Sequence, residues 1–322
     1  MIQGLSFDSL PCKGLYMCDG VAVQVITCDT VSQTIDCILV YRDGKSESMN
    51  GVTMKELQNK LYPFEDGVIK HKQFDKILTC LKCGKAVYLF GAAGAGKNVI
   101  CQQLADELGL TFYFASSVQD RFDLIGYSDA KGEYVSTEFY RAFTEGGLFM
   151  LDEMDNSCED ALITLNSALA NGYITFPIYG RKEAHPDFKV ISAGNTCGKG
   201  SNELYTGRRP LDAATLNRFV FVEVGYDKRI EFQIAKGNSE IVEFIQDLRD
   251  SSKRTGYPLV VSYRNLKDIM DLKQYFSMTE CLEMCLLKGM CADEVGVLYN
   301  GLKNKRNKFA EVLSDLYATM NR

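Results

Sequence analysis

A glycine-rich stretch that begins at residue 91 has the residue types and spacing that bind phosphate groups. It consists of Gly91, Ala92, Ala93, Gly94, Ala95, Gly96, Lys97 and Asn98. Small residues let backbone N–H groups surround a phosphate, and a lysine at this position reaches the terminal phosphates of a nucleotide. An apolar run precedes the stretch over residues 86–90, and apolar residues at helical spacing follow it over 98–108. Because the loop would open a helix, the sequence predicts a nucleoside triphosphate site rather than a glycine-rich turn without a ligand.

Asn98 stands where a serine or threonine hydroxyl usually touches Mg²⁺ in such loops. The amide oxygen of asparagine is also a hard ligand of the kind that Mg²⁺ takes. We therefore expect Asn98 to contribute to a metal site. The sequence leaves the identity of the nucleotide open between ATP and GTP, because adenine is mostly recognised by backbone and apolar contacts. ATP is the default expectation.

A pair of carboxylates follows a second apolar run. Residues 148–151 are apolar without alternation, which is typical of a central strand buried on both faces. Asp152 and Glu153 come directly after it, where open α/β sheets bind ligands. We expect Asp152 to hold Mg²⁺ through water and Glu153 to orient and polarise the attacking water. Alternatively, these acids lie near the positive end of a helix expected over residues 158–170.

Two more polar residues are candidates for the same edge of the sheet. A strand predicted over residues 188–194 leads to Asn195, whose neutral amide would hold the γ-phosphate or the lytic water. Arg218 closes a predicted helix just before a strand at 220–222. Each has a structural alternative: Asn195 as a loop-capping residue and Arg218 as a cation at a helix end.

The elements that must position these residues divide the chain into three parts. Residues 1–62 are rich in β-branched runs and predict a small β-rich module. Residues 63–226 alternate strands and helices, which indicates an α/β domain with a parallel sheet. Residues 227–322 are predicted to be helical only. The helices expected in this third part cover residues 241–250, 265–275, 282–290 and 308–317.

The chain has 322 residues, a net charge of −6 and twelve cysteines. No apolar run approaches the ~20 residues that span a bilayer, and the first ten residues lack the pattern of a signal peptide. We therefore expect no membrane segment, and free thiols in a reducing cytoplasm. The acidic net charge argues weakly against a protein that coats nucleic acid.

Taken together, the motifs resemble AAA+ ATPases in their order and spacing. The resemblance is strongest to the MoxR-like, dynein-related branch, including the cobaltochelatase ATPase subunit and ATPases encoded by phages and prophages. It is carried by residues 139–147 (FYRAFTEGG), 185–188 (HPDF) and 205–208 (YTGR). It covers roughly residues 70–275 and leaves residues 1–62 unexplained.

The resemblance implies an α/β three-layer sandwich with a five-stranded parallel sheet, a C-terminal helical lid, and a ring that usually has six subunits. In this family pattern Asn195 senses the γ-phosphate. Arg218 would be a finger that reaches a neighbouring subunit's nucleotide, with Arg208 and Arg209 as competing candidates. Arg264 would bind nucleotide as a second sensor at the start of a lid helix; alternatively, it lies on a solvated helix face.

Two segments, 123–135 and 173–181, are predicted insertions with turn residues at their centres. They either face the ring axis and grip a partner, or form packed hairpins that support the strand before Asn195. The first functional hypothesis is an ATP-driven remodeller of a protein partner, which in this branch often carries a von Willebrand-type domain. The alternatives are a nucleic-acid motor or loader, and a nucleotide-switched oligomeric binding module with little turnover, which Asn98 favours.

Overall fold

The computed structural model describes residues 15–18, 21–29, 32–40, 46–53, 56–57, 69–302 and 307–320. The chain divides into two compact units. One, here called the α/β unit, is Lys70–Asp227, and the other joins Met1–Ile69 with Lys228–Arg322. The predicted boundary between residues 62 and 63 lies outside the described residues.

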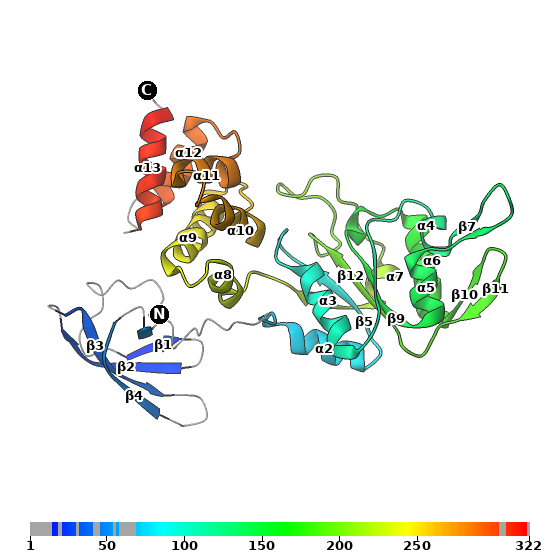
Figure 1. Cartoon of the computed structure of the whole chain (residues 1–322). Coiled ribbons are helices and arrows are strands. Elements are labelled where there is room, and N and C mark those ends of the chain that lie inside the picture. Colours follow the sequence, from blue (N-terminus) through cyan, green and yellow to red (C-terminus); the bar gives the residue numbers. More distant parts are fainter. Residues whose placement is uncertain are drawn as a thin grey trace. The chain divides into compact units, whose positions relative to one another are not determined.

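The α/β unit is built on a five-stranded sheet in the order β13-β5-β12-β9-β6, with every neighbouring pair parallel (Figure 1). Parallel strands end at the same edge, so the segments that follow β5, β9 and β12 meet there. The strands are β5 (Ala86–Phe90), β6 (Phe112–Ala115), β9 (Gly147–Leu151), β12 (Phe188–Gly194) and β13 (Phe219–Glu223).

Helices cover both faces of this sheet, because alternate strand residues point to opposite faces. In β9, Leu148 and Met150 join a core with α2 and α3, whereas Phe149 and Leu151 join a core with α5 and α6. The predicted three-layer α/β sandwich is therefore confirmed. The helices of the unit are α2 (Phe74–Lys82), α3 (Lys97–Leu108), α4 (Phe122–Ile125), α5 (Glu138–Glu145), α6 (Glu159–Asn171) and α7 (Ala213–Leu216), with a 3-10 turn η2 (Met154–Asn156).

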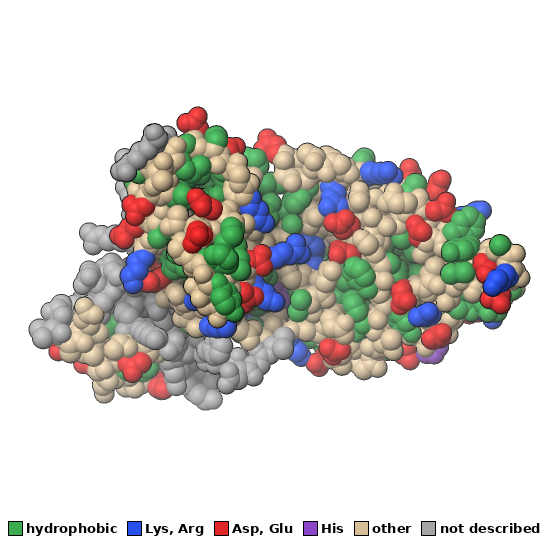
Figure 2. All heavy atoms as spheres, turned by 45° about the horizontal axis from the view of Figure 1, so that its top comes forward, with side chains coloured by type: hydrophobic (Ala, Val, Ile, Leu, Met, Phe, Trp, Pro, Cys, Tyr) green, Lys and Arg blue, Asp and Glu red, His purple; other side chains and the backbone are tan. Residues whose placement is uncertain are grey.

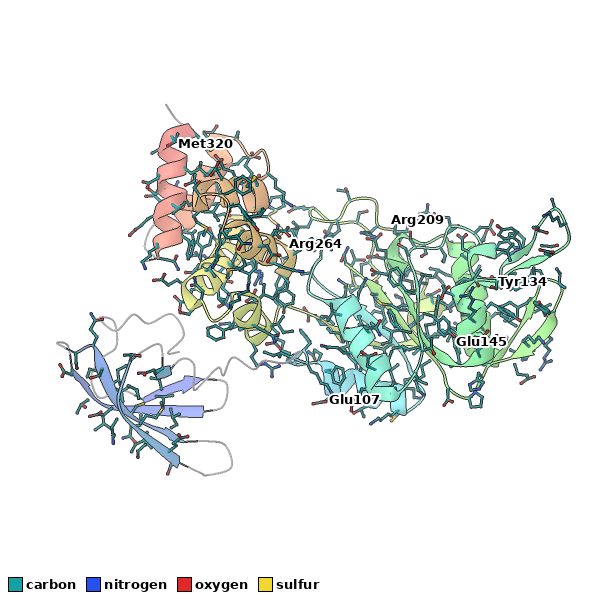
Figure 3. The ribbon with its side chains drawn as sticks, viewed as in Figure 1. Glu107, Tyr134, Glu145, Arg209, Arg264 and Met320 are labelled. Carbon is teal, nitrogen blue, oxygen red and sulfur yellow. The ribbon has the colours of Figure 1, made fainter. Side chains whose placement is uncertain are left out.

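Two antiparallel hairpins extend from one end of the α/β unit (Figure 1). One pairs β7 (Tyr127–Ser128) with β8 (Tyr134–Val135), and the other pairs β10 (Tyr173–Phe176) with β11 (Gly180–Glu183). They touch through Tyr134 and Tyr179, whose ring centroids lie 5.0 Å apart (Tyr134 is labelled in Figure 3). The two hairpins therefore form one packed surface.

The two ends of the α/β unit are tied together. The His71 ring nitrogen Nε2 lies 2.9 Å from the carbonyl oxygen of Gly225. The backbone N–H of Lys72 donates to the Asp227 carboxylate at 2.9 Å. The chain therefore enters and leaves this unit at one place.

The N-terminal module is a four-stranded antiparallel sheet in the order β1-β2-β3-β4, which confirms the predicted β-rich module. Alternate residues of β2 and β3, such as Val23, Ile35 and Leu39, are buried in its small core. The strands are β1 (Leu15–Cys18), β2 (Val21–Asp29), β3 (Thr34–Val40) and β4 (Ser46–Thr53).

Beyond Asp227 the described residues form helices around one apolar core, as predicted. The sequence did not indicate α8 or α12, and the helix expected over 282–290 overlaps α11 and a π-helical turn, η3. None of the helices in the described ranges is long and apolar enough to cross a bilayer. These elements are α8 (Lys228–Ile234), α9 (Ser239–Thr255), α10 (Tyr263–Leu272), α11 (Met278–Leu282), η3 (Glu283–Leu287), α12 (Ala292–Leu302) and α13 (Lys308–Met320).

Candidate active site

The glycine-rich loop lies between β5 and α3, as the sequence predicts. Gly91, Gly94 and Gly96 all have positive φ, at 142°, 67° and 83°, a region that glycine adopts without strain. A Cβ at Gly91 would lie 2.3 Å from the carbonyl oxygen of Val224, so only glycine fits there. The loop thus follows a fixed path into the N-terminus of α3, where backbone N–H groups are available to bind anions.

Two tyrosines hold the loop at Ala93. The backbone N–H of Ala93 donates to the hydroxyl oxygen of Tyr205 at 2.9 Å. The hydroxyl of Tyr226 donates to the carbonyl oxygen of Ala93, also at 2.9 Å. Neither tyrosine was a sequence-based site candidate, because neither is near the loop in the sequence.

Lys97 is buried at the centre of the site. Its ammonium donates to the amide oxygen of Asn195 at 3.1 Å and to the carbonyl oxygens of Gly91 and Ala92 at 3.0 and 3.1 Å. Burial lowers the pKa of Lys97, while the nearby carboxylates of Asp152 and Asp155 act in the opposite direction. The structure therefore brings together two of the predicted site residues, Lys97 and Asn195.

The two residues predicted to bind metal also lie next to each other. The amide nitrogen of Asn98 donates to Asp152 Oδ2 at 3.1 Å, and Asp152 Oδ1 accepts the backbone N–H of Glu153 at 2.9 Å. Mg²⁺ is usually held by one or two protein oxygens together with water and substrate phosphates. The carboxylate of Asp152, directly after β9, and the amide of Asn98, in the first turn of α3, supply oxygen atoms that fit that requirement.

Glu153 follows the end of β9 with left-handed backbone angles, φ 51° and ψ 40°. This conformation is uncommon for a residue other than glycine, asparagine or aspartate, and non-glycine residues that adopt it often belong to functional sites. Its carboxylate oxygen Oε1 accepts a hydrogen bond from Arg208 Nη2 at 3.2 Å. The candidate base is therefore paired with an arginine of the same chain.

Asp155 is a further acid of the site that was not predicted from the sequence. It is fully buried, and its Oδ2 accepts the backbone N–H groups of Asn195 and Thr196 at 3.1 and 3.0 Å and the Thr196 hydroxyl at 2.8 Å. Its Oδ1 pairs with Arg208 Nη1 at 3.4 Å. The sequence offered one sign of its role, since Asp155 is a third acid shortly after Asp152 and Glu153.

Gly194 precedes Asn195 for a steric reason. A Cβ at Gly194 would lie 2.0 Å from the hydroxyl oxygen of Tyr88 and 3.0 Å from the carboxyl carbon of Asp155. The Tyr88 hydroxyl itself donates to the carbonyl oxygen of Thr196 at 2.9 Å. The end of β12 is thus fixed by buried polar groups, which hold Asn195 beside Lys97.

Three arginines that were candidates from the sequence do not contact the glycine-rich loop or the carboxylates in the described contacts. The Arg218 guanidinium donates to the carbonyl oxygens of Asn166 on α6, at 3.2 Å, and Ala214 on α7. Arg209 has an exposed side chain on the loop before α7 (Figure 3). Arg264 is exposed in the first turn of α10, within the other unit of the chain (Figure 3).

The comparison with known proteins agrees with this geometry. Residues 86–219 match the family model of the AAA domain, dynein-related subfamily. An uncharacterised protein of Staphylococcus aureus is 30% identical over 211 residues, which cover 58% of this chain and 78% of that protein. A counterpart from a bovine strain of the same species is 29% identical over 211 residues.

Two solved structures are similar at low sequence identity. A RuvB mutant of Thermotoga maritima is 16% identical, with a TM-score of 0.44 and coverage of 78% of this chain and 69% of RuvB. A candidate ATPase of Cytophaga hutchinsonii is 17% identical, with a TM-score of 0.43 and coverage of 82% and 86%. The matched family model and the Staphylococcus aureus relative show that the chain belongs to the dynein-related subfamily of AAA domains and is an ATPase.

Proposed function

We propose that the protein is a subunit of an ATP-driven ring that remodels or activates a partner protein. The observation that carries this proposal is the pair of packed hairpins, which present apolar side chains to solvent on the unit that holds the ATPase site. In this proposal, ATP hydrolysis at the site provides the energy and the hairpins contact the partner protein. Arg218 connects each subunit to the nucleotide of its neighbour.

In the proposed reaction, Lys97 and the N–H groups of the glycine-rich loop hold the β- and γ-phosphates of ATP. Asp152, through water, and Asn98 would hold Mg²⁺, which would supply positive charge beside the phosphates. Water attacks the γ-phosphorus, the bond to the β–γ bridging oxygen breaks, and Glu153 accepts the proton of the water. Asn195 contacts the γ-phosphate from the end of β12.

The ring is supported by the position of Arg218. Among the described residues, its hydrogen bonds go to the carbonyl oxygens of Asn166 in α6 and Ala214 in α7, and not to the loop or the carboxylates of its own site. Those bonds use two of the five N–H donors of a guanidinium. We assign Arg218 to the nucleotide of a neighbouring subunit, because an arginine supplied in trans acts only at a subunit junction.

The hairpin surface favours a protein partner over nucleic acid. Ile178, Tyr179 and Tyr127 are 59%, 50% and 50% exposed, and hydrophobic side chains gather at this end of the unit in Figure 2. Exposed apolar groups that lie together on a surface mark sites of protein contact. Few cations lie on the hairpins: Arg181 stacks 3.5 Å over the Tyr173 ring and pairs with Glu183 at 2.8 Å, Lys182 Nζ lies 5.9 Å from the centroid of the Tyr179 ring, and Lys131 is exposed.

Ile178 lies at the tip of its hairpin with φ 64°. Positive φ is strained for a β-branched residue, and such strain is most often kept where a site needs a side chain in one place. This supports a role for the tip in contacting a partner. The resemblance of the sequence to the MoxR-like branch makes the proposal more specific. We propose that the ring has six subunits and that the partner carries a von Willebrand-type domain.

Photo-crosslinking tests the proposal. The Glu153→Gln variant would carry p-benzoylphenylalanine in place of Ile178, and a matched control would carry it in place of Ile163, which is equally exposed on α6 (57%). We expect ATP-dependent crosslinks to protein from position 178 only. Crosslinks to nucleic acid would instead support a motor or loader. ATP-dependent assembly without crosslinks, and with little turnover in the parent protein, would support a nucleotide-switched module.

A further inference from the structure

We propose that Arg208 is a positioning residue for Glu153 of its own chain, held in place by Asp155, and that its loop ties Glu153 to the phosphate-binding loop. The inference rests on the role of Glu153 in the proposed function. It does not depend on the ring or on the partner.

The contacts of Arg208 carry the inference. Its guanidinium bridges two carboxylates, with Nη2 3.2 Å from Glu153 Oε1 and Nη1 3.4 Å from Asp155 Oδ1. The side chain is only 14% exposed. A planar guanidinium has separate donors for two acceptors, which a lysine ammonium cannot present in the same fixed geometry. Glu153 is therefore held at a set distance from a buried anchor.

Asp155 is a firm anchor because it is buried and fixed by three further hydrogen bonds. These bonds come from Asn195 and Thr196, at the end of β12. Arg208 is thus placed by the same carboxylate that places Asn195. The candidate base and the candidate γ-phosphate sensor share one support.

The loop that carries Arg208 also reaches the glycine-rich loop. Its base is closed by a bridge between Lys199 and Pro210, and the Ser201 hydroxyl donates to the carbonyl oxygen of Arg208 at 2.8 Å. Within the loop, Tyr205 accepts the backbone N–H of Ala93 at 2.9 Å. One segment therefore contacts both the phosphate-binding loop and Glu153, and fixes the distance between them.

The same contacts argue that Arg208 is not the arginine that reaches a neighbouring subunit's nucleotide. Both terminal nitrogens of Arg208 bond carboxylates of its own chain. Moving this side chain to a neighbouring subunit would leave the buried carboxylate of Asp155 without its countercharge, which is strongly unfavourable. Arg208 acts in cis, and Arg218 remains the candidate for the neighbour.

A double-mutant cycle between Arg208→Ala and Glu153→Gln tests the inference. In the parent background, Arg208→Ala should lower kcat at least about tenfold and change KM for ATP by less than about threefold, because it affects the water-activating step and not the phosphate cradle. In the Glu153→Gln background it should add less than about a twofold loss in single-turnover assays, because the residue through which it acts is already disabled. Multiplied losses in the double variant would overturn the inference.

Two further experiments apply if Arg208→Ala does not fold or if the loss of kcat has another cause. Arg208→Lys keeps a cation beside Asp155 and can replace Arg208→Ala in the cycle. We expect its kcat to stay below that of the parent protein; a kcat equal to the parent value would contradict the bridging geometry. Mixing Arg208→Ala with Lys97→Ala should not restore turnover, since neither chain then has a complete cis site, and restored turnover would make Arg208 a trans residue. If Glu153→Gln alone hydrolyses ATP at the parent rate, the proposed function fails, whatever Arg208 does.

Discussion

Lys97 and Asn195 meet across the candidate site, with the ammonium of one donating to the amide oxygen of the other at 3.1 Å although 98 positions separate them in the sequence. They come from the segments after β5 and β12, which are neighbouring parallel strands. A phosphate held by Lys97 would therefore lie within reach of Asn195. The residue proposed to bind the nucleotide and the residue proposed to sense the γ-phosphate therefore lie side by side.

Lys97→Ala should abolish ATP binding, because the phosphates lose their main side-chain cation in a site otherwise made of neutral N–H groups. Isothermal titration calorimetry with ATP and Mg²⁺ measures this directly. Lys76→Ala on the exposed face of α2 is the matched control and should bind as the parent does. Micromolar affinity retained by Lys97→Ala would contradict the assignment of the loop.

Glu153→Gln should keep ATP binding and slow hydrolysis by roughly 10²-fold or more, because an amide cannot accept the proton of water. Phosphate release under saturating ATP is the measurement. Glu159→Gln is the matched control: it removes a negative charge from the exposed first turn of α6 and should leave turnover unchanged. If Glu153→Gln turns over at the parent rate, Glu153 is structural.

Asn98→Thr should leave Mg²⁺-dependent ATP binding intact or tighten it, since a hydroxyl is the more usual ligand at this position. Titration of ATP affinity against Mg²⁺ concentration tests the expectation. Complete loss of binding would mean that the amide, which bonds Asp152 in the structure, makes contacts that a hydroxyl cannot replace.

Arg218→Ala should bind nucleotide normally and lose most ATPase activity, because phosphate charge at a neighbour's site loses its arginine. Mixed with the inactive Lys97→Ala, it should regain some turnover, since mixed junctions pair an intact loop with an intact finger. A helix-end cation would instead cost about 0.3–1 kcal/mol of stability with normal turnover. If the mixture stays inactive although both variants assemble together, Arg209 becomes the better candidate.

Asp155→Ala should lower the free energy of unfolding by about 3–5 kcal/mol, the usual range when one partner of a buried ion pair is removed. The change removes the acceptor of the polar groups of Asn195 and Thr196 and one of the two carboxylates that Arg208 bonds. Urea unfolding followed by circular dichroism measures it. A loss under 1 kcal/mol would show that water replaces the carboxylate at little cost.

Local patterns in the sequence were enough to predict the sheet and to identify most of the residues that lie together in the candidate site. The loop at 91–98 and the acids after β9 are each defined by neighbouring residues, and the parallel order of strands brings their ends together. The contact between Arg208 and Glu153 was not predictable, because it spans 55 positions and depends on the path of an irregular loop. Asp155 was missed because its burial arises only from tertiary packing.

Helix α12 shows a different limit of sequence patterns. It contains Gly296 and Gly301, which lower helix propensity. In the structure a Cβ at Gly296 would lie 2.8 Å from the ring of Tyr317, and one at Gly301 would lie 1.7 Å from the hydroxyl of Ser251. Close packing against other helices therefore requires the residues that made the helix hard to predict.

The bonds from His71 to Gly225 and from Lys72 to Asp227 have a consequence for how this chain is assembled. Because the first and last residues of the α/β unit lie at one point, the unit has the geometry of a domain inserted into another chain. Neighbouring modules can be exchanged or lengthened at this single junction without changing the path of the sheet. The same ATPase body is therefore suited to being combined with different flanking modules.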